Sequence, residues 1–436
     1  RRWTYRELQA RVEALTSDLL VRLGDGLGEG DGEQTVAVLL PHDARAPMAL
    51  LAVLHTGRVP VPLDPTFPPE RNRRILERSA AALVIGTPEG RAAAGALLGA
   101  ATAWLNLDAE GWPQPPEAEA PARRPLRGSD PAWLLFTSGS TGEPKGVLQN
   151  QRGLLHDVMQ YTNAIHLRPE DRLTQLYSAS VSGALRDIYG ALLNGACLLP
   201  LPVAELGAAG VLEVIRRERI TVLHAIPGIF RLLLEAMPPG ERLPDLRLVY
   251  LAGDRIDRSD LETFRARVPG PCWLYLGIGS TENATLYAHH FLGPEAPLPP
   301  GPPPVGRELP DRPLRLLGDD GQPVPAGAIG EIECTSRYLA QGYWRDPQAT
   351  AERFLPQPGD ASVRRFRSGD LARLGADGLL TFVGRRDAQV KIAGRRLEPG
   401  EVEAALQALP EVERALVMAL PAAAGGLALT AWLQAS

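Results

Sequence analysis

The chain has 436 residues, of which 44% are hydrophobic and 22% charged, and its formal net charge is −5. This balance is that of an ordinary globular protein, and the dispersed charge argues against nucleic acid as a partner. Three widely separated cysteines fit neither a disulfide framework nor a zinc cluster, so a reducing cytoplasm is expected. No apolar run approaches the roughly 18 residues that span a membrane. The length predicts about three domain-sized units, and the start at Arg1, without a signal peptide, predicts a piece of a longer protein.

The first part of the chain predicts alternating helices and strands. Thr4-x-x-Glu7 is a capping box that starts one helix, and a second helix begins at Pro47 and ends near residue 55. Apolar segments at 36–40, 59–63 and 82–85 predict strands, and a further helix passes through Ile75 and Leu76. Such alternation indicates a parallel sheet covered by helices. A linker rich in Pro, Glu and Ala follows at 111–125.

A second alternating region follows in the middle of the chain. Helices are expected near 153–162, at 211–219 and after the capping box Ser259-x-x-Glu262, with strands at 222–226, 246–251 and 272–276. A Pro-rich crossing at 293–304 leads to short strands at 330–334, 364–367 and 379–383 between Asp/Gly turns, which predict a small β-rich unit. A last helix starts at 401–406.

Residues 136–147, F-T-S-G-S-T-G-E-P-K-G-V, have the chemistry of an anion site. A buried strand at 132–136 enters a run of small and hydroxyl residues, Thr137, Ser138, Gly139, Ser140, Thr141 and Gly142, and Lys145 adds a positive charge. Successive backbone N–H groups in such a turn bind phosphate oxygens. Gly146 follows the lysine where a P-loop has Ser or Thr. Composition alone leaves a polyphosphate site and a surface turn both open.

The twelve residues together resemble the phosphate loop of the adenylate-forming enzymes: acyl-CoA synthetases, luciferases and the adenylation domains of nonribosomal peptide synthetases. Further motifs follow in that family's order and are closest to the peptide-synthetase branch; they lie at 3–8, 59–71, 280–282, 330–344, 367–371 and 384–401. The resemblance implies an α/β fold. We expect a large domain at 1–386, with two doubly wound subdomains and a β-rich part at about 305–386, then a hinge and a truncated α+β subdomain at 387–436.

The resemblance also implies ATP and Mg²⁺ as cofactors and assigns their residues. Thr281 would contact the nucleotide phosphate and Glu282 would hold magnesium, and with Lys145 they are the candidate catalytic residues. Ile278 occupies the place of the family's usual adenine-stacking aromatic residue. Asp370 would grip the ribose diol, Arg385 would contact the ribose, and Asp387 would be the hinge. Without the resemblance, Thr281-Glu282 is a helix cap and Asp370 a turn residue.

The sequence departs from the family pattern near its end. The family's catalytic lysine lies late in the small subdomain, and no lysine follows Lys391 here. A preorganised cation on the transferring phosphoryl group is a large electrostatic contribution to catalysis. We therefore expect slow adenylation with much of the nucleotide affinity retained. A trimmed subdomain and an inserted domain would both produce this pattern.

The acid pocket holds a second departure. Amino-acid-activating members place an aspartate against the substrate ammonium, and the corresponding residue, counted back from Gly190, is Ser182. A neutral hydroxyl does not offset the burial of an ammonium group. The same count gives the remaining pocket candidates, Gly183, Arg186, His224, Tyr250, Ala252, Gly277 and Thr285. Arg186 either faces the substrate, where it would favour an oxygen or a second carboxylate, or forms a surface pair with Asp187.

These residues predict two-step activation of a carboxylic acid other than a standard α-amino acid. The carboxylate attacks ATP, and the phosphopantetheine thiol of a carrier protein, in the same megasynthase, takes the acyl group. One rival is a stand-alone acyl-CoA ligase. Another is a non-catalytic, adenylation-like scaffold, favoured by Ile278 and the absent lysine and opposed by the phosphate loop, Glu282, Asp370 and Arg385.

Overall fold

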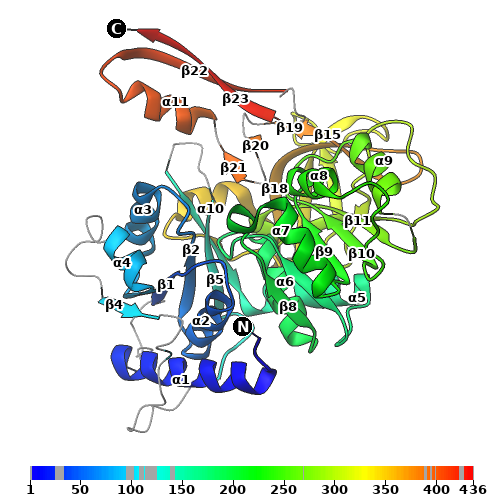
Figure 1. Ribbon diagram of the computed structural model, residues 1–436. Coiled ribbons are helices and arrows are strands. Elements are labelled where there is room, and N and C mark those ends of the chain that lie inside the picture. Colours follow the sequence, from blue (N-terminus) through cyan, green and yellow to red (C-terminus); the bar gives the residue numbers. More distant parts are fainter. Residues whose placement is uncertain are drawn as a thin grey trace.

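The computed structural model contains two helix-covered sheets, a β-rich part and a small C-terminal unit (Figure 1). It describes residues 2–24, 34–94, 103–107, 112, 125–137, 143–268, 270–386, 390–392, 395–397, 399–421 and 427–435. This architecture confirms the predicted α/β fold class. No helix among the described residues has the length and apolar character needed to cross a bilayer.

The N-terminal sheet is parallel, with the strand order β2-β1-β3-β4. Its elements are α1 (Tyr5–Leu23), β1 (Thr35–Leu39), α2 (Arg45–His55), β2 (Val59–Leu63), α3 (Pro69–Ser79), β3 (Leu83–Gly86), α4 (Pro88–Ala94) and β4 (Ala103–Asn106). Alternate side chains of β1 point to opposite faces: Val36 and Val38 pack with α1 and α2, whereas Ala37 and Leu39 pack with α3. Both faces are therefore covered, and every residue of β1 is buried.

The second sheet has seven strands in the order β13-β12-β11-β10-β9-β7-β8, parallel from β11 to β8. Its strands are β7 (Arg172–Gln175), β8 (Cys197–Pro200), β9 (Val222–Ala225), β10 (Leu248–Leu251), β11 (Trp273–Gly279), β12 (Leu286–Leu292) and β13 (Arg307–Glu308). Its helices are α5 (Gln151–Ile165), α6 (Gly183–Leu193), α7 (Val203–Arg217), α8 (Pro227–Ala236) and α9 (Arg258–Arg267). Helices α5 and α6 pack on one face, and α7, α8 and α9 on the other.

A three-stranded antiparallel sheet contains the anion-loop segment. It consists of β5 (Pro131–Thr137), β6 (Lys145–Asn150) and β16 (Gly342–Tyr343). The buried strand predicted at 132–136 is confirmed by β5. Strand β6 was not predicted. It forms an antiparallel hairpin with β5, in which Thr137 pairs with Lys145.

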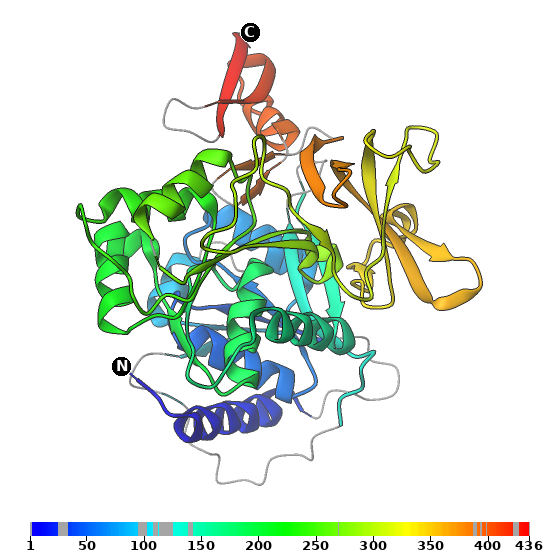
Figure 2. The same ribbon diagram turned by 90° about the vertical axis from the view of Figure 1, so that its right-hand side faces the viewer.

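The β-rich part and the C-terminal unit complete the chain (Figure 2). The β-rich part contains β14 (Leu314–Leu317), β15 (Ile329–Ser336), α10 (Pro347–Arg353), β17 (Phe354–Gln357), β18 (Asp360–Leu374) and β19 (Leu380–Arg385). The C-terminal unit contains β20 (Val390–Ile392), β21 (Arg395–Leu397), α11 (Pro399–Gln407), β22 (Val412–Pro421) and β23 (Leu427–Ala435). The short strand predicted at 364–367 is wrong in length, because it belongs to the 15-residue β18.

Two predicted helix starts are also wrong. Helix α9 is capped by Asp257 with Asp260, not by Ser259 with Glu262: the Asp260 carboxylate accepts the backbone N–H of Asp257 at 2.8 Å. Helix α7 starts at Val203 rather than near residue 211, with a kink at Gly207, where φ is 63°. The error at α9 comes from a capping spacing that two neighbouring pairs of residues both satisfy, whereas at α7 the first turns before the kink at Gly207 were not predicted.

The packing of β5 against α6 can be tested at Trp133. Its side chain is fully buried and meets Tyr189 edge to face, with ring centroids 5.7 Å apart. We expect Trp133→Ala to lower the free energy of unfolding by about 3–5 kcal/mol, because the cavity left behind is only partly refilled. Urea denaturation followed by circular dichroism measures this. Trp273→Ala, at a tryptophan that is 47% exposed, is the control, and an equal loss there would contradict the assignment.

Candidate active site

A cavity of about 300 Å³ lies at the carboxyl ends of the parallel strands of the second sheet, where ligands bind in open α/β sheets. Residues from β9, β10 and the segments that follow β7 and β11 form its walls, and Phe67, Arg71 and Phe136 approach from the N-terminal sheet and the hairpin. Of the predicted site residues, those that line it are Thr137, Ser182, Gly183, His224, Tyr250, Ala252, Thr281, Thr285 and Arg385.

Other predicted site residues do not line the cavity. Ser138, Gly139, Ser140, Thr141, Gly142 and Asp387 lie outside the described residues. Lys145, Arg186, Gly277, Ile278, Glu282 and Asp370 are described but are absent from the cavity wall. Ile278 pairs with Ala288 across β11 and β12 and packs toward the β-rich part. Gly277 lies behind the wall, where an added Cβ would come within 2.5 Å of the Leu286 side chain.

The Thr281–Glu282 motif lies on a single 3₁₀ turn, η1 (Thr281–Asn283), directly after β11. The Thr281 hydroxyl donates a hydrogen bond to the Ser182 hydroxyl at 3.4 Å, which joins this turn to the start of α6. Glu282 is 1% exposed, and its Oε1 accepts a hydrogen bond from the Tyr343 hydroxyl at 3.1 Å. Lys145 lies over the same tyrosine ring, with Nζ 5.7 Å from the centroid.

The donor set at Glu282 fits magnesium only together with a phosphate ligand. The described residues contain no group of three or more His, Cys, Asp or Glu side chains placed to hold a metal. Magnesium is commonly held by one or two carboxylates, with phosphate oxygens and water completing its shell. If magnesium binds here, Glu282 would supply one oxygen ligand and a bound polyphosphate would supply others; Glu282 itself is buried and absent from the cavity wall.

Asp370 and Arg385 face each other across β18 and β19. Arg385 donates a hydrogen bond to Oδ1 of Asp370 and to the backbone oxygen of Ser368, and the Tyr287 hydroxyl donates to Oδ2. Burial, together with the neighbouring Asp370 charge, raises the pKa of Tyr287 well above its usual value. Tyr287 therefore stays a hydrogen-bond donor, and Asp370 is held rigidly behind Arg385, which reaches the cavity.

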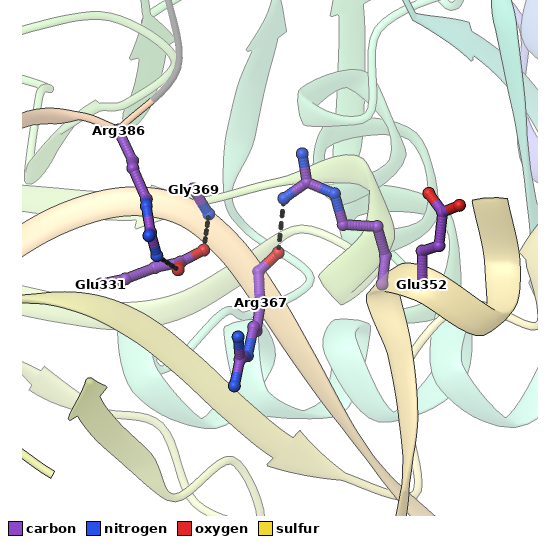
Figure 3. Close-up of a pocket in the computed structure, with 6 residues that line it drawn as sticks. Glu331, Glu352, Arg367, Gly369 and Arg386 are labelled. Carbon is purple, nitrogen blue, oxygen red and sulfur yellow. Dashed lines mark hydrogen bonds and ion pairs between the residues drawn. The ribbon is translucent and has the colours of Figure 1, made fainter. Parts of the chain in front are cut away.

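Glu331 of β15 contacts Gly369 and Arg386, which are the sequence neighbours of Asp370 and Arg385 (Figure 3). Its carboxylate accepts the backbone N–H of Gly369 at 3.0 Å and forms an ion pair with Arg386 at 3.0 Å. Gly369 has a φ of 77°, a conformation that favours glycine. The contacts of Glu331 thus fix the backbone on both sides of the Asp370–Arg385 pair.

Arg186 adopts neither of the two predicted arrangements. It is fully buried and binds Asp157 through two hydrogen bonds, of 2.9 and 2.7 Å, rather than facing the cavity or pairing with Asp187 at the surface. Arg312 lies on the other side of Asp157, at 3.7 Å, and donates to the backbone oxygens of Asn283 and Leu286. Burial acts to raise the pKa of Asp157, but the charges of Arg186 and Arg312 and the hydrogen bonds from Arg186 outweigh it and hold that pKa below its usual value.

Several cavity residues were not predicted from the sequence. Arg71 and Phe67 belong to the motif at 59–71, to which no site residue was assigned, and the Arg71 guanidinium lies 5.0 Å from the Phe67 ring centroid. Tyr177 follows β7 and donates a hydrogen bond to the backbone oxygen of Ala252 at 2.9 Å. The P-E-R triplet that ends the motif was the available signal for Arg71. Tyr177 has no comparable local signal.

Comparison with known proteins identifies the family. The sequence profile described as AMP-binding enzyme matches residues 1–344. The chain belongs to the AMP-binding enzyme family. The curated relatives of this AMP-binding enzyme include CymA of Salinispora arenicola, a probable non-canonical nonribosomal peptide synthetase, with 33% identity over 432 residues. Phenyloxazoline synthase MbtB of Mycobacterium tuberculosis is 35% identical over 435 residues. The resemblance stated from the motifs is thereby confirmed.

The match to CymA covers 99% of this chain but only 5% of CymA, and the match to MbtB covers 98% of this chain but 29% of MbtB. Among solved structures, the NpsA-ThdA adenylation–PCP di-domain of Klebsiella oxytoca is 26% identical with a TM-score of 0.82, covering 99% of this chain and 83% of that one. The amide bond synthetase McbA of Marinactinospora thermotolerans is 28% identical with a TM-score of 0.83, covering 100% and 85%. The fold of this AMP-binding enzyme is therefore shared along the described chain.

The buried ion pair of this AMP-binding enzyme can be tested at Asp157. Asp157→Asn removes the carboxylate that faces Arg186 and Arg312 and leaves their charges buried. We expect the free energy of unfolding to fall by about 3–5 kcal/mol in urea denaturation. The control is Asp18→Asn, which removes the surface partner of Arg22 and is expected to cost less than about 1 kcal/mol. Equal losses would contradict a structural role for the buried pair.

Proposed function

We propose that the protein activates a carboxylic acid with ATP, as an acyl-adenylate, and passes the acyl group to the phosphopantetheine thiol of a carrier protein. The observation that carries the proposal is the 3.4 Å contact between Thr281 and Ser182. This contact connects two parts of one cavity: the turn that is proposed to bind phosphate and the start of the helix that is proposed to bind the acid. A carboxylate and an α-phosphate bound there would be adjacent, which is the requirement for an in-line attack.

The chemistry divides between the two sides of the cavity. A carboxylate oxygen attacks the α-phosphorus, the bond to the bridging oxygen breaks, and pyrophosphate leaves. The hairpin loop 138–142, with Thr137 and Thr281, is proposed to bind the phosphates. Magnesium, held by Glu282 and phosphate oxygens, would neutralise the charge of the leaving group when bound. Arg385, held by Asp370, is proposed to orient the ribose.

The domain division is part of the same proposal. We assign 1–386 to the large core and 387–436 to a hinge, at Asp387, and the C-terminal subdomain residues that follow it. The peptide synthetases among the relatives support a carrier protein as acceptor rather than free CoA. Three free cysteines, Cys197, Cys272 and Cys334, support a reducing cytoplasmic location. Comparing CoA with a purified carrier domain as acyl acceptor separates this function from a stand-alone acyl-CoA ligase.

The acid is proposed to lack an α-amino group. Ser182 lines the cavity, and no described residue of the cavity wall is an aspartate or glutamate. Asp187, the carboxylate nearest in sequence, is fully buried and hydrogen-bonded to His224, so it does not lie in the cavity as an ammonium partner. Arg71 and Arg385 line the same cavity. Arg385 is already paired with Asp370, so the case against a substrate ammonium rests on the lack of a carboxylate in the described cavity wall and not on a net positive charge.

Nucleotide binding is the first test. The protein should bind ATP or AMP in the presence of magnesium. Asp370→Ala should weaken binding by about 1.5–3 kcal/mol, the range for hydrogen bonds to a charged group, because Arg385 loses the carboxylate that holds it at the cavity. Isothermal titration calorimetry measures both affinities, with Asp377→Ala on the exposed turn before β19 as the control. Absence of binding heat at millimolar ATP would favour the non-catalytic scaffold.

Acid selectivity is the second test. In acid-dependent pyrophosphate exchange, 2-hydroxy, 2-keto, aryl and aliphatic acids, with β-amino acids, should be preferred over the twenty standard amino acids. Leaving an ammonium without a carboxylate partner in a buried site costs about 2–5 kcal/mol. Ser182→Asp should shift the selectivity toward an amino acid, with Ser180→Asp as the control on the same cavity wall. A standard amino acid preferred tenfold over its deaminated analogue, about 1.4 kcal/mol, would refute this part of the proposal.

A further inference from the structure

An aromatic wall closes the end of the cavity beyond Ser182. The His224 ring stacks on Tyr250 with centroids 3.9 Å apart and lies 4.5 Å from the Tyr177 ring on its other side. All three rings line the cavity, and His224 is only 1% exposed. A histidine held between two rings has a fixed orientation, so its two nitrogen atoms point in fixed directions.

Asp187 fixes one of those nitrogen atoms. Its Oδ1 lies 2.8 Å from Nδ1 of His224, and the carboxylate is fully buried. Burial raises the pKa of Asp187, against the charge and hydrogen bond of His224. With Asp187 ionised, its oxygen accepts the hydrogen bond, so Nδ1 carries the proton. Nε2 is then left with a lone pair and acts as an acceptor. The carboxylate selects the imidazole tautomer in the same way that it does in hydrolase triads.

Nε2 of His224 has no hydrogen-bond partner among the described residues, and neither has the hydroxyl of Tyr250. Buried polar atoms in folded proteins are nearly always bonded, and an exception in a cavity wall points to a ligand. Gly183 keeps this end of the cavity narrow but open, because a Cβ there would lie 3.4 Å from the Tyr177 ring and 3.5 Å from Cε1 of His224. Because His224 lines the cavity, a donor on a bound molecule is one available partner for Nε2, and a buried water is another.

We propose that His224, positioned by Asp187, accepts a hydrogen bond from a hydroxyl or N–H group on the acid, and so restricts the substrate to small acids that carry such a donor. The inference rests on the proposed function, because it places the carboxylate beside Thr281 and Ser182. Ser182 and Gly183 are consecutive residues, so the carboxylate and the donor lie only a short distance apart. An acid without the donor leaves Nε2 buried and unbonded.

The test uses matched acids on the full-length protein and needs no variant. Each set contains the parent, hydroxy and fluoro acid, since fluorine has a similar size but donates no hydrogen bond. The sets are benzoates substituted at positions 2, 3 and 4, and butanoates substituted at positions 3 and 4. In pyrophosphate exchange, at least one hydroxy acid should exceed both its parent and its fluoro analogue by about tenfold or more in kcat/KM, the loss expected for one unsatisfied buried acceptor.

Two outcomes would overturn the inference while the proposed function stands. Exchange that is equal or faster with the parent or fluoro acids in every set would show that no donor is recognised. Binding of ATP without exchange for any acid of the panel would show that this substrate class is wrong. Failure to bind ATP would instead contradict the proposed function itself, so the two failures are separated by one titration.

Variants then assign the effect to individual atoms. His224→Phe keeps the stacked ring but removes Nε2, and should reduce the hydroxy-to-fluoro ratio to about one. Asp187→Asn can donate to Nδ1 and so favour the opposite tautomer, and should also lower that ratio, with the Kd for ATP unchanged in both variants. His290→Phe, on β12 and outside the cavity wall, is the matched control. A hydroxy-to-fluoro ratio that survives His224→Phe would overturn the assignment.

Discussion

The site depends on one buried group of charges, Asp157 between Arg186 and Arg312. Asp157 lies on α5 and Arg186 on α6, and Arg312 binds the backbone oxygens of the segment that follows Thr281. Buried charges of this kind are rigid, since separating any one of them from its partner leaves an unsolvated ion. The start of α6 and the 3₁₀ turn are therefore held at a fixed distance, and the contact between Ser182 and Thr281 follows from it.

The second constraint is the alternation of side chains along parallel strands. In β9 and β10, His224 pairs in register with Tyr250, and Tyr275 of β11 lies next to it. These residues face α5 and α6, whereas their neighbours Leu223 and Val249 face α7 and α8. One face of the sheet thus collects aromatic and polar side chains at its carboxyl edge, while the other face is lined mainly by apolar side chains. The site needs this asymmetry because stacking on Tyr250 orients His224.

The sequence predicted the site where its chemistry is local. The run from Phe136 to Val147 and the Thr281–Glu282 pair each carry their signal within a few residues, so the strand before the first and the turn of the second could be placed. Contacts between distant residues could not be placed. Arg186 follows Ser182 by one helical turn, and that spacing alone cannot distinguish a cavity residue from one bound to Asp157 on another helix. Tyr177 and Arg71 were missed for the same reason.

Two errors have a common cause: the capping residues predicted for α9, and the surface pair predicted between Arg186 and Asp187. Several acidic or hydroxyl residues meet the same spacing rule, and tertiary partners decide between them: Asp260 is chosen because Arg231 binds it, at 2.8 Å. On α6, the two consecutive residues Arg186 and Asp187 are committed to different partners, Asp157 and His224. A single helical turn therefore supports both the buried charges around Asp157 and the aromatic wall that contains His224. Neither Arg186 nor Asp187 can hold a substrate charge without breaking its present contact. Acid selectivity at this end of α6 is therefore left to Gly183 and to Ser182, the residue that precedes the helix.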